Sequence, residues 1–192
     1  MSQPREGTPE YWAEHRPDAP AVIRGERVLT YRKWNDTADR IAEGLAALGL
    51  QAGDRLGMRF RLAPERFIVH RALQKLGATQ VAVNWRLTPD EALYILRDIG
   101  AKGLACNDVD VRGWEGHGVG LLVIVGQSAD AVGVRFEDLL DTEVITPRFG
   151  AARPSLVLYT SGTTGRPRGV PPLDSATVND FSPDRLARSV KA

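Results

Sequence analysis

Residues 156–169, LVLYTSGTTGRPRG, lead from an apolar segment directly into one rich in glycine, hydroxyl groups and positive charge. The glycines allow backbone conformations that are closed to other residues, and they let main-chain amides approach an anion closely. The hydroxyl groups add further donors, and Arg166 and Arg168 offer guanidinium groups that pair with phosphate oxygens in a fork geometry. This combination predicts a loop that binds a polyphosphate, and a nucleoside triphosphate is the natural candidate for this ligand.

An ordinary polar surface turn is the competing interpretation, because glycine, threonine and proline also punctuate loops without any ligand. The segment lacks the Gly-Lys-Ser/Thr ending and the glycine spacing of a Walker A loop. P-loop ATPases and kinases are therefore disfavoured.

Strand and helix patterns alternate in the chain before this loop. We expect helices that begin at Thr8-Pro9-Glu10, after Thr30, at residue 64 and at a capping box that starts with Thr88. The expected strands cover residues 21–23, 28–30, 55–60, 79–83, 102–106, 121–125 and 156–159. Helices of this length between strands favour parallel pairing through right-handed crossovers, so the predicted fold is α/β, a largely parallel sheet with flanking helices.

Apolar residues at helical spacing mark the second helix as a core element. Its stripe consists of Trp34, Ala38, Ile41, Ala42, Leu45 and Leu48. Thr30 is placed to cap the start of this helix and Gly49 to end it. Gly77 closes the next helix, over residues 64–76, in the same way. We expect these elements to position the loop and not to form a site themselves.

Composition narrows the class of protein. The 192 residues carry 25 basic and 24 acidic side chains, a formal charge of +1, which gives no global field for nucleic acid or an anionic membrane. The single cysteine, Cys106, excludes an internal disulfide and cysteine zinc clusters, and we expect it to be buried at a strand end. The longest apolar run, residues 121–125, is far too short for a membrane span, and the N-terminus has no signal-like apolar stretch, so we expect a cytoplasmic protein.

The three histidines give no metal site. His117 lies in an irregular segment, residues 107–119, without a second histidine or a cysteine nearby, and a solvent-exposed role is expected for it. His15 and His70 lie on predicted helices, and the same surface role is expected for them.

The string YTSGTTGRPRGV closely resembles the phosphate-binding signature of the adenylate-forming (AMP-binding) enzymes, a superfamily of acyl-CoA synthetases, luciferases and peptide-synthetase adenylation domains. Two earlier stretches, residues 29–58 and 73–96, resemble segments of acyl-CoA synthetases in the same order. The resemblance covers about residues 11–170 and is strongest to acyl-CoA synthetases. It implies a partial N-terminal domain of an adenylate-forming enzyme.

The resemblance also implies a chemistry. In the family a carboxylate attacks the α-phosphorus of ATP with the help of Mg²⁺, pyrophosphate leaves, and the acyl-adenylate passes its acyl group to a thiol, commonly that of coenzyme A. The residues that would contact the phosphates are Thr160, Ser161, Gly162, Thr163, Thr164, Gly165 and Arg168. Arg168 stands where the family usually has lysine, so a point-charge donor becomes a planar fork. No catalytic residue and no metal ligand is assigned.

The sequence beyond the loop departs from the family pattern. Pro171 and Pro172 remove two backbone donors from any strand ladder, and residues 171–192 look divergent and weakly structured. Residues 1–170 are then a truncated N-terminal (AMP-binding) domain that ends at the phosphate-binding loop. The family's adenine-binding segment, magnesium-coordinating acid, ribose-binding aspartate and catalytic lysine all follow this loop, and none has a counterpart here.

We therefore expect the N-terminal fragment of an ATP-dependent acyl-CoA synthetase, a ligase of fatty acid metabolism, that is inactive as an isolated chain. A nucleotide is the expected partner, and a carboxylic acid binds only if a missing C-terminal part completes the site. Open sheet edges predict poor solubility or self-association.

Two alternatives remain at this point. The first is a non-catalytic module that binds a nucleotide or polyphosphate, or one half of a split enzyme that needs a partner. The second, weaker one is a small complete enzyme that uses Asp180 and Asp184, for which solvated acids at a helix start are the favoured explanation.

Overall fold

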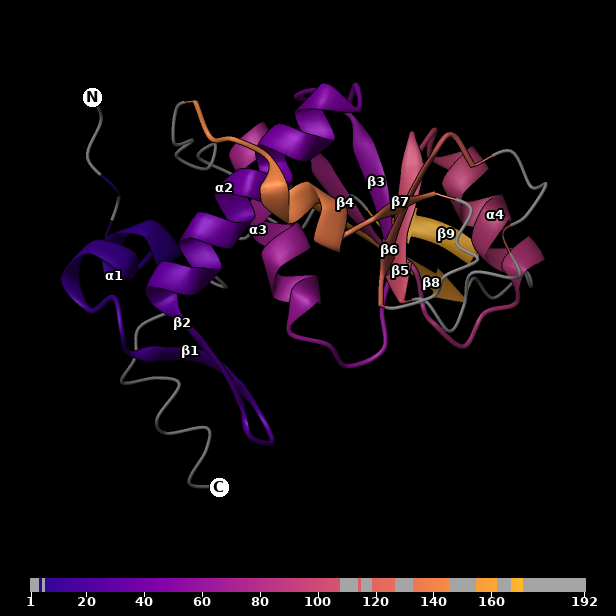
Figure 1. Cartoon of the computed structure of the whole chain (residues 1–192). Helices are drawn as coiled ribbons and strands as arrows, with labels where there is room; N and C mark the ends of the chain where they lie inside the picture. The colour runs from indigo at the N-terminus through magenta and orange to yellow at the C-terminus, as the bar shows by residue number, and fades with distance from the viewer. Residues whose placement is uncertain are drawn as a thin grey trace.

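The computed structural model describes residue 4, residues 6–107, residue 114 and residues 119–126, 133–145, 155–161 and 167–170. A seven-stranded sheet in the order β7-β6-β5-β3-β4-β8-β9 forms its centre, and a separate two-stranded sheet, β1-β2, lies near the N-terminus (Figure 1). Every neighbouring pair from β7 to β8 is parallel, and β9 alone joins antiparallel. The predicted α/β class with a largely parallel sheet is confirmed.

The strands follow the apolar segments of the sequence. They are β1 Pro20–Arg24, β2 Arg27–Thr30, β3 Arg55–Arg59, β4 Thr79–Ala82, β5 Gly103–Asn107, β6 Leu121–Val125, β7 Val134–Arg135, β8 Ser155–Ser161 and β9 Pro167–Val170. The short strand β7, a 3-10 helix at Glu137–Asp141 and β9 were not predicted. The last described residue of β9 is Val170.

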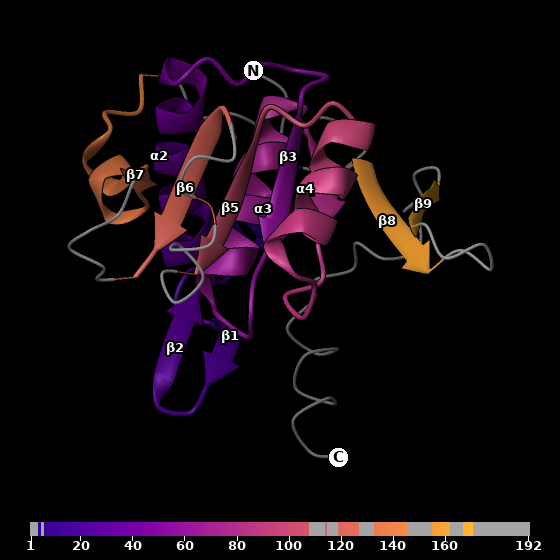
Figure 2. The same cartoon turned by 90° about the vertical axis from the view of Figure 1, so that its right-hand side faces the viewer.

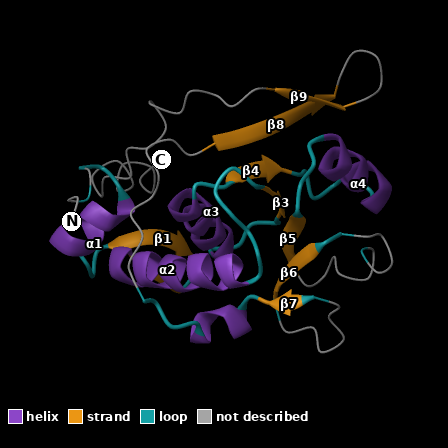
Figure 3. Cartoon of the chain, turned by 90° about the horizontal axis from the view of Figure 1, so that it is seen from above, coloured by secondary structure: helices purple, strands orange, loops and turns teal. Residues whose placement is uncertain are grey.

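Helices cover both faces of the large sheet. Helices α2 Tyr31–Ala47 and α3 Glu65–Leu76 lie on one face, and α4 Pro89–Asp98 lies on the other (Figures 2 and 3). The short helix α1 Pro9–His15 packs against α2. Among the described residues, none of the helices has the length and apolar character needed to cross a membrane.

The helix ends lie where the capping residues predict. Thr8, Thr30 and Thr88 are the N-caps of α1, α2 and α4, and each side chain accepts a backbone N–H of the first turn. Thr88 and Glu91 complete a capping box. Gly77 ends α3 with a left-handed φ of 72°, which favours glycine. These local signals therefore fix the helix bounds.

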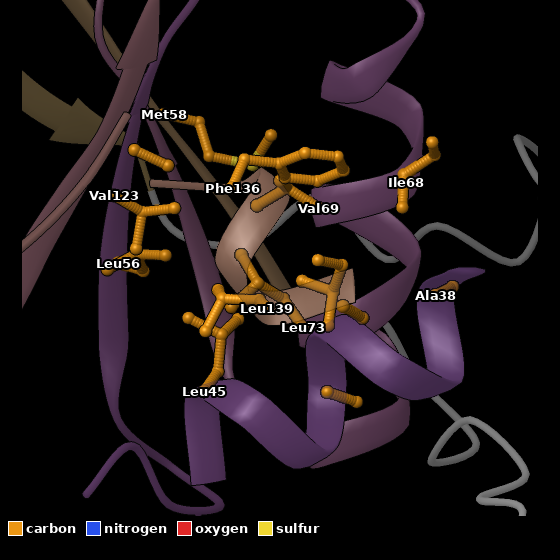
Figure 4. Packing of buried hydrophobic residues seen from close by; sticks show 14 of the residues in the cluster. Ala38, Leu45, Leu56, Met58, Ile68, Val69, Leu73, Val123, Phe136 and Leu139 are labelled. Carbon is orange, nitrogen blue, oxygen red and sulfur yellow. The ribbon is translucent and has the colours of Figure 1, made fainter. Parts of the chain in front are cut away.

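The apolar side chains form one cluster on each face of the sheet. Leu56 and Met58 of β3 and Val123 of β6 face α3, where Val69 and Leu73 meet them (Figure 4). Apolar residues of β4, β5 and β6 on the opposite face pack against α4. Successive strand residues point to opposite faces, so strands with two apolar faces are buried between helices.

Two residues lie differently from the sequence expectation. Leu48, the last member of the apolar stripe, is 42% exposed because α2 ends at Ala47 and Leu48 becomes its C-cap. His70, expected at the surface, is half-buried and bonded to Gln80 of β4. His15 is exposed and Cys106 is fully buried near the end of β5, as predicted. His117, Pro172, Asp180, Asp184 and the expected tail 171–192 lie outside the described residues.

Candidate functional site

The signature segment forms a β-hairpin at one edge of the sheet. Strands β8 and β9 pair antiparallel, with Thr160 opposite Arg168 and Ser161 opposite Pro167 (Figure 3). Three of the predicted site positions, Thr160, Ser161 and Arg168, therefore lie beside one another in the backbone ladder. The other four, Gly162, Thr163, Thr164 and Gly165, lie outside the described residues, in the connection between the two strands.

The neighbouring strand fixes where this hairpin opens. β8 runs parallel to β4, with Thr79 opposite Ser155 and Ala82 opposite Leu158. The carboxyl ends of β3, β4, β5, β6 and β8 consequently lie at the same end of the sheet, and β8, which the signature loop follows in the sequence, ends there. Ligands of open α/β sheets bind outside the carboxyl ends of the strands.

Arginine side chains gather at the end of the sheet where the parallel strands have their carboxyl ends. Arg59 ends β3 and is only 6% exposed, and its Nη2 donates to the carbonyls of Trp85 and Leu87 at 2.7 and 2.9 Å. These bonds hold the loop that follows β4 against the end of β3. The same guanidinium carbon lies 5.5 Å from the centroid of the buried Trp114 ring.

Two exposed guanidinium groups lie close to the ring of Trp85. The guanidinium carbons of Arg61 and Arg86 are 4.7 and 4.3 Å from its ring centroid, a distance at which cation and ring attract. The main-chain N–H of Arg61 donates to Asn107 at 2.8 Å, and that of Arg86 donates to Asn84 at 3.0 Å. Side chains at the ends of β4 and β5 thus fix the two backbones that carry these cations.

Sequence reasoning missed this group of cations. The residues are far apart in the chain, and each one alone looks like a solvated surface arginine. One signal was available: arginines lie at or just after the ends of two apolar strands that were expected to be parallel. The carboxyl ends of parallel neighbours lie at the same end of the sheet.

The strand that enters the loop is also tied to helix α4. Tyr159 Oη donates to Asp98 Oδ2 at 2.7 Å, and the ring packs partly buried against the apolar cluster under α4. Desolvation, reinforced by the Asp98 carboxylate, raises the pKa of Tyr159, so the hydroxyl remains a donor at neutral pH. The bond restrains the residue directly before Thr160.

The cations at this end of the sheet suit a polyphosphate. The guanidinium groups of Arg61 and Arg86 lie at the carboxyl ends of the strands, and guanidinium groups bind phosphate oxygens. Within the described part of the chain, no group of three or more His, Cys, Asp or Glu side chains could hold a metal ion.

Comparisons with known proteins identify the family of this chain. The model of the AMP-binding enzyme family matches residues 9–180, which extends past Val170. The fatty acid–[acyl-carrier-protein] ligase ScoC of Streptomyces coeruleorubidus is 34% identical over 166 residues, 85% of this chain and 31% of that protein. The 3-hydroxybenzoate–CoA/4-hydroxybenzoate–CoA ligase of Thauera aromatica is 30% identical over 159 residues, 78% of this chain and 30% of that protein.

A solved structure shares the fold. The o-succinylbenzoate coenzyme A synthetase MenE from Bacillus subtilis, solved in complex with AMP, superposes with a TM-score of 0.69 at 24% identity, over 88% of this chain and 42% of that one. The chain thus spans about a third of the length of the curated relatives that it matches.

These relatives favour a ligase segment over a stand-alone polyphosphate-binding module, because the chain resembles the N-terminal part of AMP-forming acyl-CoA ligases. With the signature on a hairpin at the carboxyl edge of the sheet and a family match from residue 9 to residue 180, this chain belongs to the AMP-binding enzyme family.

Proposed function

We propose that this chain supplies the phosphate-binding part of an ATP-dependent acid–thiol ligase that works through an acyl-adenylate. The observation that carries the proposal is the position of the signature strands: β8 ends where the parallel strands have their carboxyl ends, and Arg59, Arg61 and Arg86 lie at that same end of the sheet. In this proposal residues 1–170 form the N-terminal AMP-binding domain up to its phosphate loop, and residues 171–192 are a divergent tail.

The loop's task is to hold the β- and γ-phosphates of ATP and to stabilise charge on the departing pyrophosphate. Hydroxyl and amide donors of residues 160–165 bind the phosphate oxygens, and the guanidinium of Arg168 neutralises part of their charge. ATP supplies the leaving group when a carboxylate attacks its α-phosphorus, and Mg²⁺ shields the phosphates. The arginines at the carboxyl ends of the strands create a positive field there, and this field favours the approach of the polyanion.

The substrate class follows from the relatives' printed activities. One acts on a fatty acid and acyl-carrier protein and another on hydroxybenzoate and coenzyme A, so we propose a fatty or aromatic carboxylic acid and a thiol such as that of coenzyme A. We place the protein in the cytoplasm, where ATP and coenzyme A are available.

For the chain by itself we propose nucleotide binding without turnover, since it corresponds to about a third of the matched relatives. Calorimetry with Mg·ATP and an assay of carboxylate-dependent pyrophosphate release test the two halves of this statement. Turnover by the isolated chain would overturn the proposed inactivity, and absent heat of binding would overturn the nucleotide site.

Thr164→Ala tests the loop assignment. We expect it to weaken ATP binding by about tenfold, because it removes a hydroxyl donor to a charged oxygen. Thr37→Ala on α2, away from the hairpin, is the matched control and should leave the affinity unchanged. Equal affinities of Thr164→Ala and the unmodified chain would show that the loop does not hold the phosphates.

A further inference from the structure

The hydrogen bond between Tyr159 and Asp98 lies where strand β8 loses its neighbour. The pairing of β8 with β4 ends at Leu158, opposite Ala82. Tyr159 is the first residue beyond that pairing, and from there the described ladder of β8 continues with β9 alone. The Tyr159 side chain supplies a link to the body of the molecule at the point where this backbone pairing stops.

The other end of this link is firmly held. Asp98 is the last residue of α4, whose inner face is buried against the sheet and whose first turn is closed by the Thr88 capping box. Just beyond Asp98, the carbonyl of Ile99 accepts a bond of 2.7 Å from Arg55 Nη1 at the start of β3. Helix α4, and with it the backbone of the exposed Asp98, is therefore held against the sheet at both ends of the helix.

We infer that Asp98 is a positioning residue of the phosphate-binding loop, which it orients through Tyr159; this inference rests on the proposed function. Tyr159 is followed directly by Thr160, and in the ladder it stands opposite Gly169, so both strands of the hairpin meet at the tethered residue. A tether at this position sets the direction in which the hairpin leaves the sheet. The phosphate contacts of residues 160–165 depend on that direction, because displacements of about 1 Å are enough to lose properly aligned hydrogen bonds.

The alternative is that the bond stabilises the fold and has no effect on the loop. The two roles differ in which measurement changes: a bond that only stabilises the fold alters the free energy of unfolding but leaves the ATP affinity and the loop signals unchanged. Asp98→Asn keeps an amide oxygen that accepts the Tyr159 hydroxyl, whereas Asp98→Ala and Tyr159→Phe remove one partner each. Tyr11→Phe on α1, which lies away from the hairpin in Figure 3, controls for the loss of a tyrosine hydroxyl elsewhere.

Calorimetry with Mg·ATP measures the first consequence. Asp98→Ala and Tyr159→Phe should each weaken binding by about fivefold, and the double variant should be no weaker than either single one, because both remove the same bond. Asp98→Asn and Tyr11→Phe should bind like the unmodified chain. Urea unfolding measures the stability of each variant. It checks that more than about nine-tenths of the protein is folded under the conditions of the titrations.

Amide NMR spectra without nucleotide provide a readout that does not depend on ATP. The signals of Gly162 and Gly165 should shift in Asp98→Ala and in Tyr159→Phe, and they should keep their positions in Asp98→Asn. Unchanged glycine signals in the first two variants would overturn the inference, whether or not the chain binds ATP. Shifted signals in a chain that does not bind ATP would leave the positioning role standing and overturn the proposed function. Unchanged ATP affinity in a chain that does bind would overturn the positioning role.

Discussion

His70 is a half-buried histidine on α3 whose two ring nitrogens both have protein partners. Nδ1 contacts Gln80 Oε1 of β4, and Nε2 lies 2.9 Å from Gln74 Nε2. Gln74 turns its oxygen to the Arg71 guanidinium, so its amide nitrogen is the donor to His70. This arrangement fits only the neutral ring with its proton on Nδ1.

A second proton on His70 would break this arrangement and add positive charge beside Arg71 and Arg66. Burial is the largest cause that lowers the pKa of His70 from 6.5 to about 4, and the two arginines lower it further. The bond to Gln80 acts in the opposite direction and raises this pKa. Because the pKa of the folded state lies below that of the unfolded chain, the unfolded chain binds more protons between these values. The free energy of unfolding should therefore fall as the pH drops from 6.5 towards 4.

His70→Gln tests this dependence. The variant should lose stability at pH 7, because the packing and the bond to Gln80 change, but its unfolding free energy should depend less on pH between 6.5 and 4.5. Urea unfolding followed by circular dichroism at several pH values measures both effects. The exposed His15 gives the control His15→Gln, which should keep the slope of the unmodified protein. Equal slopes in all three proteins would assign the pH dependence to other groups.

At the scale of elements, a buried ionic network joins three helices. Lys75 of α3 has a side chain that is 1% exposed, and its Nζ lies 3.2 Å from Glu10 of α1 and 2.8 Å from Asp39 of α2. Arg71 binds both carboxylate oxygens of Glu10. Burial alone raises the pKa of Glu10, but Arg71 and Lys75 overcome this effect and hold the pKa below its usual value. The network thereby fixes α1 on the helical layer.

Removing Lys75 should be costly. Lys75→Ala leaves Asp39 and part of Glu10 uncompensated away from water, for which we expect a loss of about 3–5 kcal/mol in the free energy of unfolding. Lys102→Ala is the matched control: its Nζ lies 2.7 Å from Asp54, but its side chain is 48% exposed, so the expected loss is about 0–1 kcal/mol. Denaturant unfolding at pH 7 compares the two variants, and similar losses would show that burial does not set the strength of these ion pairs.

On the scale of the whole molecule, the two edges of the large sheet differ. β7 at one edge has two residues, whereas β9 at the other has four and pairs with β8 alone among the described strands. A longer edge strand is a template for pairing with another chain. Leu62 and Ile145, 73% and 86% exposed, add apolar surface. We propose that the isolated chain self-associates through β9.

Sedimentation velocity over a range of protein concentrations tests this association. We expect larger species at higher concentration, with slower hydrogen exchange at the amides of β9 and unchanged exchange in β2 of the separate small sheet. A monomer at every concentration, or exchange in β9 that does not depend on concentration, would contradict the proposal.

The order and bounds of most elements could be predicted because their signals are local. A threonine at the N-cap accepts the backbone N–H three residues later, in the first turn of its helix. Gly77 ends α3 in a left-handed conformation that glycine adopts without strain. Apolar runs between such signals become buried strands. The signature segment likewise indicated its own chemistry, because glycines, hydroxyl groups and arginines act within a few residues of one another.

Contacts between distant segments could not be predicted in this way. The two-residue strand β7 has no pattern of its own and exists because β6 offers it a partner. The sequence predicted His70 at the surface, whereas in the fold Gln80 of the next strand contacts its ring and helps to bury it. The tether from Tyr159 to Asp98 spans 61 positions of the chain, and the arginines beside Trp85 come from separate strand ends. The sheet order decides these neighbours, because pairing and burial depend on the whole chain, whereas caps and turns depend on adjacent residues.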